Sequence, residues 1–133
     1  MTQRASLDGS RKWWMLTFGM FAQMAQAILV NGVAFLIPTL QDDHGLSLAR
    51  TGIVVAAPTI GVMTTLVLWG GLADRFGERR VLATGLALAA ASAAGAALSP
   101  SLPWMTVLLV LGGMAAASAN AASGRVVVGW FPP

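Results

Sequence analysis

The stretch that decides the fold is Gly70-Gly71-Leu72-Ala73-Asp74-Arg75-Phe76-Gly77-Glu78-Arg79-Arg80-Val81-Leu82. It gathers five charged residues in a short segment bracketed by glycines, between two long apolar runs. Glycine adopts backbone conformations that other residues avoid, so Gly77 suits a tight turn. A charged turn between two apolar runs indicates two antiparallel helices whose connection lies outside an apolar medium.

The composition of the whole chain indicates that this medium is a lipid bilayer. Only 10% of the 133 residues are charged, and the mean hydropathy is +0.73. A soluble domain is about 25% charged, and one soluble core of this size cannot bury so much apolar surface. The formal charge is +3, but the basic residues are not interleaved with exposed aromatic residues. This pattern argues against nucleic acid as a partner. The chain has no cysteine, so disulfides and thiolate metal sites are excluded.

Four apolar runs are long enough to cross a bilayer, which takes about 20 residues of helix. We expect membrane helices near residues 13–40, 51–73, 81–98 and 103–131. These runs must be helical because lipid offers the backbone no hydrogen-bond partners. Residues 1–12 are expected to form a short cytoplasmic tail. The predicted fold is an all-α, polytopic membrane helix bundle over residues 13–133.

The basic residues predict the orientation of the bundle. Six of them precede the first run or lie between the second and third: Arg4, Arg11, Lys12, Arg75, Arg79 and Arg80. The other two connections hold a single basic residue, Arg50. Because positive residues concentrate on the cytoplasmic side, we expect a cytoplasmic amino terminus in the plasma membrane, the inner membrane of a bacterial cell. The tryptophans agree, because all of them fall at predicted membrane boundaries: Trp13, Trp14, Trp69, Trp104 and Trp130.

Two prolines are expected to interrupt the helices, and one serine is expected to start a helix. Pro58 lies inside the second run and should kink it, because proline lacks a backbone donor. Pro38 should bend or end the first helix. Ser47 can cap the second helix, after the turn of residues 42–45. That turn holds two aspartates and a histidine, but no other ligand cluster accompanies them, so a solvated external loop is expected rather than a metal site.

The charged stretch resembles the loop between the second and third membrane helices of the major facilitator superfamily of transporters. The family pattern reads G-x-L-A-D-R/K-x-G-R/K-R/K-x-x-L. Eight residues of this chain match it: Gly70, Leu72, Ala73, Asp74, Arg75, Gly77, Arg79 and Leu82. Glu78 departs from the pattern, which usually has a base at that position.

The resemblance implies a conformational latch in this loop. In the family, the matching acidic residue helps to lock the two halves of the carrier together on the cytoplasmic side when the carrier faces outward. Asp74 would then be the latch residue, with Arg75 and Arg79 in its charge network. Gly70 would permit close approach of helices, and Gly77 the tight turn. Without the resemblance, the same charges are expected of a solvated loop that simply joins two helices.

Five polar or charged residues inside the predicted helices are candidates to line a cavity. Gln23, Gln26 and Asn31 fall within an arc of about 140° on the first helix. Asn120 and Arg125 lie on the fourth helix, and the family lines its cavity with its first and fourth helices. Interhelical hydrogen bonding is the alternative for the amides, and the Arg125 side chain can instead reach the cytoplasmic headgroups.

The function implied is secondary active transport of a small solute by alternating access, and not an enzyme activity. The sequence holds no nucleophile–base pair, phosphate loop or metal cluster, so we predict no catalytic, cofactor or metal site. Arg125 would favour an organic anion. Coupling to a proton is common in the family, but the four predicted helices contain no Asp or Glu. A proton-carrying carboxylate would therefore lie elsewhere.

The number of helices leaves two architectures open. Carriers of the family consist of two six-helix halves with the substrate between them, so about four helices are expected to be the amino-terminal part of a carrier that needs further C-terminal helices. The alternative is a self-contained four-helix membrane protein, either an oligomeric small multidrug-type carrier or a protein that does not transport. Small multidrug carriers depend on a glutamate in the first membrane helix, which this chain lacks.

Overall fold

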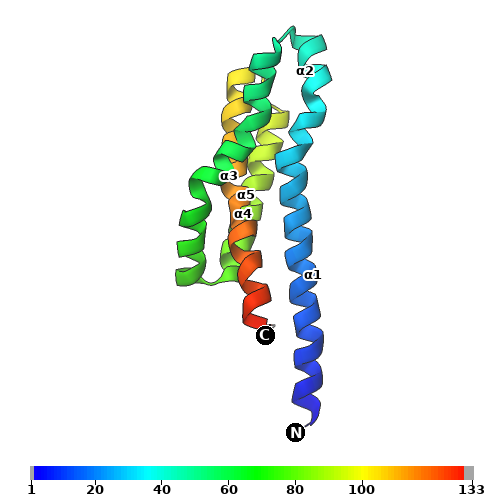
Figure 1. Ribbon diagram of the computed structural model, residues 1–133, viewed down its shortest axis with the longest axis vertical. Helices are drawn as coiled ribbons and strands as arrows, with labels where there is room; N and C mark the ends of the chain where they lie inside the picture. Colours follow the sequence, from blue (N-terminus) through cyan, green and yellow to red (C-terminus); the bar gives the residue numbers. More distant parts are fainter. Residues whose placement is uncertain (1, 131–133) are drawn as a thin grey trace.

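The structure is a computed structural model that describes the backbone of residues 2–130 and the side chains of residues 13–121 except Met15. The described elements are all helical: α1 (Thr2–Gly32), η1 (Val33–Leu36), α2 (Ile37–His44), α3 (Leu48–Phe76), α4 (Glu78–Ala97) and α5 (Leu102–Trp130). They lie side by side along one long axis (Figure 1). Four stretches are long and apolar enough to cross a membrane: Leu16–His44, Leu48–Phe76, Glu78–Ala97 and Leu102–Ala121. The predicted all-α membrane bundle is therefore confirmed.

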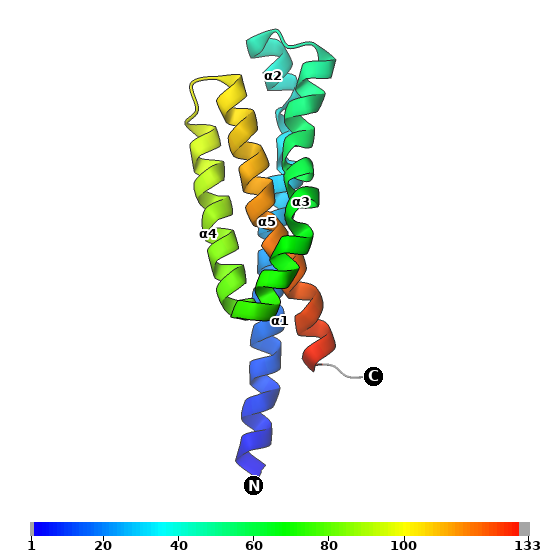
Figure 2. The same ribbon diagram turned by 90° about the vertical axis from the view of Figure 1, so that its left-hand side faces the viewer.

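The first membrane-spanning stretch is built from three helical pieces. α1 begins at Thr2 and extends past the α3–α4 turn (Figure 2), so the segment expected as a tail continues the helix. No proline or turn motif separates that segment from the apolar run. η1 then replaces the α-helix with a tighter 3₁₀ turn, and Pro38 stands in the first turn of α2. Proline is tolerated there because the first backbone donors of a helix have no partner within it.

The connection between α2 and α3 follows the rules of helix capping. Gly45 ends α2 with φ 59° and ψ 28°, in the left-handed region that favours glycine. Ser47 then caps α3, and its Oγ accepts a hydrogen bond of 3.5 Å from the Arg50 backbone N–H. The cap assigned to Ser47 from the sequence is present.

α5 is the central helix, packed between α3 and α4 and bordered by α1. Its middle turns are buried except at Met114, which is half-buried, and the buried residues are all small: Gly112, Gly113, Ala115, Ala116, Ala117, Ser118 and Ala119. Small side chains let helix backbones approach closely in a membrane, where no hydrophobic force drives helices together. This seam explains why α5 can serve three neighbours at once.

The closest approach in the bundle is between the backbones of α3 and α5. A Cβ atom added to Gly61 would lie 2.7 Å from the Met114 nitrogen, and one added to Gly113 would lie 2.7 Å from the Pro58 Cα. Real Cβ atoms essentially never come that close to other atoms. Pro58 lies inside α3, which changes direction part-way along its length (Figure 1), as expected of a proline kink. The crossing of the two helices therefore requires glycine at both positions.

We predict that Gly113→Ala lowers the free energy of unfolding by about 1–3 kcal/mol, the usual cost of overpacking a tight core. Denaturant titration of the purified chain in detergent micelles measures this. The matched control is Gly52→Ala on α3, where an added Cβ has no described atom within 4 Å. That control should be neutral or stabilising by up to about 1 kcal/mol. Equal stability of the two variants would contradict the account.

Candidate functional site

The charged stretch forms a turn in which one residue separates two antiparallel helices. α3 ends at Phe76 and α4 begins at Glu78, so Gly77 alone joins them. Its φ of 87° and ψ of 145° lie in a region essentially restricted to glycine. The Gly77 N–H donates to the Ala73 carbonyl at 3.1 Å, and the Val81 N–H donates to the Gly77 carbonyl at 3.3 Å. The turn is therefore tied into both helices by backbone hydrogen bonds.

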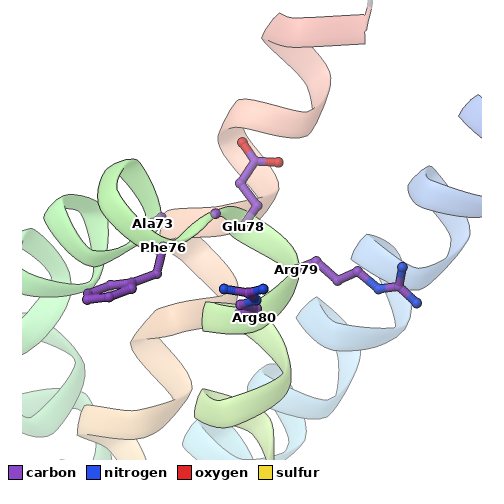
Figure 3. A pocket seen from close by; sticks show the side chains of 6 residues that line it. Ala73, Phe76, Glu78, Arg79 and Arg80 are labelled. Atoms are coloured by element: carbon purple, nitrogen blue, oxygen red, sulfur yellow. The ribbon is translucent and has the colours of Figure 1, made fainter.

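The side chains of the turn surround a shallow depression of about 520 Å³ (Figure 3). Phe76 and Arg79 extend from the turn in opposite directions, and Glu78 points away from both. The Arg75 guanidinium carbon lies 5.8 Å from the centre of the Phe76 ring, within the range of a cation–π contact. The turn thus presents an open, charged surface at the end of the bundle.

The charges of this surface are arranged by the two helix ends. Asp74 and Arg75 lie in the last turn of α3, while Arg79 and Arg80 lie in the first turn of α4, and all four are exposed. Glu78, which departs from the family pattern, is the first residue of α4. A carboxylate is favoured there by the positive end of the helix dipole. This position gives Glu78 a local structural role that does not depend on the pattern.

The candidate cavity residues do not converge on one pocket. Gln26 lines a narrow groove of about 230 Å³ between α1, α4 and α5, whose other walls are Ala, Leu and Ile side chains. Asn31 lies about 140° away around α1, at 3.6 residues per turn. It is exposed, and its Nδ2 donates to the Ala27 carbonyl of the same helix at 3.0 Å. Gln23 on α1 and Asn120 on α5 are half-buried. The Arg125 side chain lies outside the described residues.

A polar contact inside the bundle was not anticipated from the sequence. Trp69 was expected at the membrane boundary, but its indole Nε1–H donates to the Met114 carbonyl of α5 at 2.5 Å. Thr65, one helical turn earlier, donates to the same carbonyl at 2.9 Å. The spacing of four residues was the available signal, because it places both side chains on one face of α3. Nothing in the sequence indicates which helix that face meets.

The chain is similar to one protein family and to known transporters. Residues 17–133 match the model of the Major Facilitator Superfamily. The chain is 44% identical over 122 residues to an uncharacterized MFS-type transporter of Mycobacterium tuberculosis, covering 92% of this chain and 27% of that protein. It is 34% identical over 101 residues to the niacin transporter NiaP of Acinetobacter baylyi, covering 76% of this chain and 22% of that protein. No solved structure matches significantly.

These findings, with the helical bundle and its charged turn, define a multi-pass integral membrane protein of a transporter class. The chain belongs to the major facilitator superfamily. The resemblance found in the charged stretch is thereby confirmed, and membrane transport is the general function that the family and its relatives support. The chain spans about a quarter of the length of the curated relatives reported above.

We predict that Gly77→Ala weakens the turn by about 1–3 kcal/mol, because a side chain forces strain at this φ and ψ. The thermal unfolding midpoint of the chain in detergent measures the loss. Gly71→Ala is the control, since it lies in helical α3 with no described atom within 4 Å of the added Cβ. If both variants unfold at the same temperature, the turn does not depend on glycine.

Proposed function

We propose that this chain contributes its helices to a secondary active carrier, which moves a small solute by alternating access. In this proposal the charged turn between α3 and α4 is the cytoplasmic latch. The observation that carries the proposal is the geometry of the turn: a single glycine holds two helix ends together while Asp74, Arg75 and Arg79 stay exposed. Exposed charges on a rigid turn can be engaged in one conformation of a carrier and released in the other.

The strength of such contacts suits a latch. A hydrogen bond to a charged group contributes about 1.5–3 kcal/mol, enough to shift a two-state equilibrium by roughly ten- to a hundredfold. A buried ion pair would be far costlier to break. The exposed position of Asp74 therefore supports a contact that forms and breaks during each transport cycle.

The glycines before the turn support the same role. Gly70 lies in the last turns of α3, and no described atom lies within 4 Å of a Cβ built there. Gly61 on the same helix contrasts with it, because its Cβ position is filled by the backbone of α5. Gly70 is thus not needed for packing among the described residues, and it leaves room for close approach by a further helix.

The proposed solute is an organic anion. Gln23, Gln26, Asn31, Asn120 and Arg125 are proposed to line its path, with Arg125 supplying the positive charge. The exposed amide of Asn31 lies on α1, and the half-buried amide of Asn120 lies on α5. Each of these two helices therefore carries an amide of the kind that hydrogen-bonds a polar solute. The name of one relative, niacin transporter, supports this class of solute, because niacin is a small aromatic carboxylate.

We predict that Asp74→Asn reduces uptake at least about tenfold, because it removes a charged partner from the latch. The measurement is uptake of labelled nicotinate by cells that express the Acinetobacter niacin transporter with its matching segment replaced by this chain. Asp42→Asn is the control, an exposed carboxylate in α2 outside the motif. Equal uptake by the Asp74 and Asp42 variants would contradict a latch at Asp74.

The proposed orientation places the amino terminus and the charged turn in the cytoplasm of a bacterial cell, at its inner membrane. Since the chain has no cysteine, single cysteines report sidedness directly. We predict that a membrane-impermeant maleimide labels Asp43→Cys in spheroplasts and labels Arg79→Cys only after the membrane is permeabilised. Both residues are exposed in the folded chain. The reverse pattern would overturn the orientation.

A further inference from the structure

The Met114 carbonyl of α5 is the point at which side-chain hydrogen bonds from α3 meet. It accepts from the Thr65 hydroxyl at 2.9 Å and from the Trp69 indole N–H at 2.5 Å. Thr65 also lies 3.1 Å from the Gly61 carbonyl of its own helix, so its single proton has two acceptors in reach. The indole N–H is a donor only, and Met114 is the acceptor that the structure assigns to it. The Trp69 indole therefore makes the more specific of these two hydrogen bonds to the Met114 carbonyl.

The position of Trp69 in α3 links this carbonyl to the charged turn. Trp69 directly precedes Gly70, the first residue of the motif. α3 and α5 lie side by side (Figure 1). α3 is bent between its crossing with α5 at Pro58 and its C-terminal end at Phe76. Because the helix is stiff between Trp69 and Phe76, any shift of the indole against α5 also displaces the turn that follows.

We propose that Trp69 is a positioning residue: its indole N–H holds the C-terminal half of α3, and with it the charged turn, against α5 through the Met114 carbonyl. That carbonyl also accepts the Ser118 backbone N–H within α5 and the Thr65 hydroxyl, so loss of the indole removes a contact that positions the turn without leaving a buried acceptor unpaired. The importance of this hydrogen bond for transport rests on the proposed latch, but the hydrogen bond itself lies within this chain.

Distance measurement between two spin labels tests the proposal. Labels attached at Val67→Cys on α3 and Leu111→Cys on α5 report the separation of the two helices, and both positions are exposed in a cysteine-free chain. In nanodiscs the parent should give one narrow distance. Trp69→Phe keeps an aromatic ring but removes the donor, and we expect a second, altered distance whose share rises about tenfold.

A matched variant makes that result specific. Trp104→Phe is the control, because Trp104 is 63% exposed at the other end of the bundle, and it should leave the distance unchanged. If Trp69→Phe gives the same distribution as Trp104→Phe, the proposal is wrong.

The unmodified chain supplies a readout that does not depend on the folding of any Trp69 variant. With ¹⁵N-labelled tryptophan, the indole N–H of Trp69 should exchange with deuterium at least about tenfold more slowly than that of Trp104. Equal exchange rates would overturn the proposal. Neither measurement involves uptake, so failure of Asp74→Asn to change transport would remove the latch and leave the positioning role of Trp69 standing.

Discussion

The backbone contact between α3 and α5 is the constraint on which the rest of the structure depends. Gly61 on α3 faces α5, and Gly113 on α5 faces α3, with no side chain between the two backbones. A Cβ added to either glycine would overlap backbone atoms of the other helix. In a membrane, such contacts replace the hydrophobic force that packs helices in water. Gly85 repeats the arrangement on the other side, where its missing side chain leaves room for Ser118. α5 thereby binds α3 and α4 into one unit.

This unit determines where the charged turn lies and how it behaves. α3 and α4 are each packed on α5, so the single residue between them has little freedom, and Gly77 takes a positive-φ conformation that only glycine adopts without strain. A rigid turn keeps the relative positions of Asp74 and Arg79 constant, whichever partners they meet. α1 stands apart from this unit, with an open apolar groove between it and α4. The arrangement thus separates a firmly packed part of the chain from a more loosely attached helix.

The sequence was sufficient for features governed by local chemistry. The length of the apolar runs predicted the membrane helices, Ser47 predicted its cap, and the prolines predicted the interruptions at η1 and in α3. The charged motif predicted the family, which the comparison confirmed. These signals depend on neighbouring residues or on the bilayer, and both are visible in a single sequence.

Features that depend on contact between distant helices were not predictable. The indole of Trp69 is consistent with a membrane boundary until the structure places Met114 beside it. The arc on α1 that holds Gln26 and Asn31 reads as one polar face, but only Gln26 borders the groove between helices. Which side of a helix meets a neighbour depends on the whole packing, and a periodic pattern of small residues does not specify it. The roles assigned to Asp74 and to the cavity residues remain proposals for the same reason.

The central claim is that packing at the α3–α5 crossing holds the charged turn rigid. Amide hydrogen exchange at Gly77 and Val81 in nanodiscs tests it most directly, because Gly77 is exposed and Val81 is buried in the first turn of α4, and both amides donate hydrogen bonds across the turn. The account predicts that they exchange as slowly as the α3 amides around Gly61, through one shared opening of the bundle. Fast exchange at the turn, independent of those core amides, would contradict it.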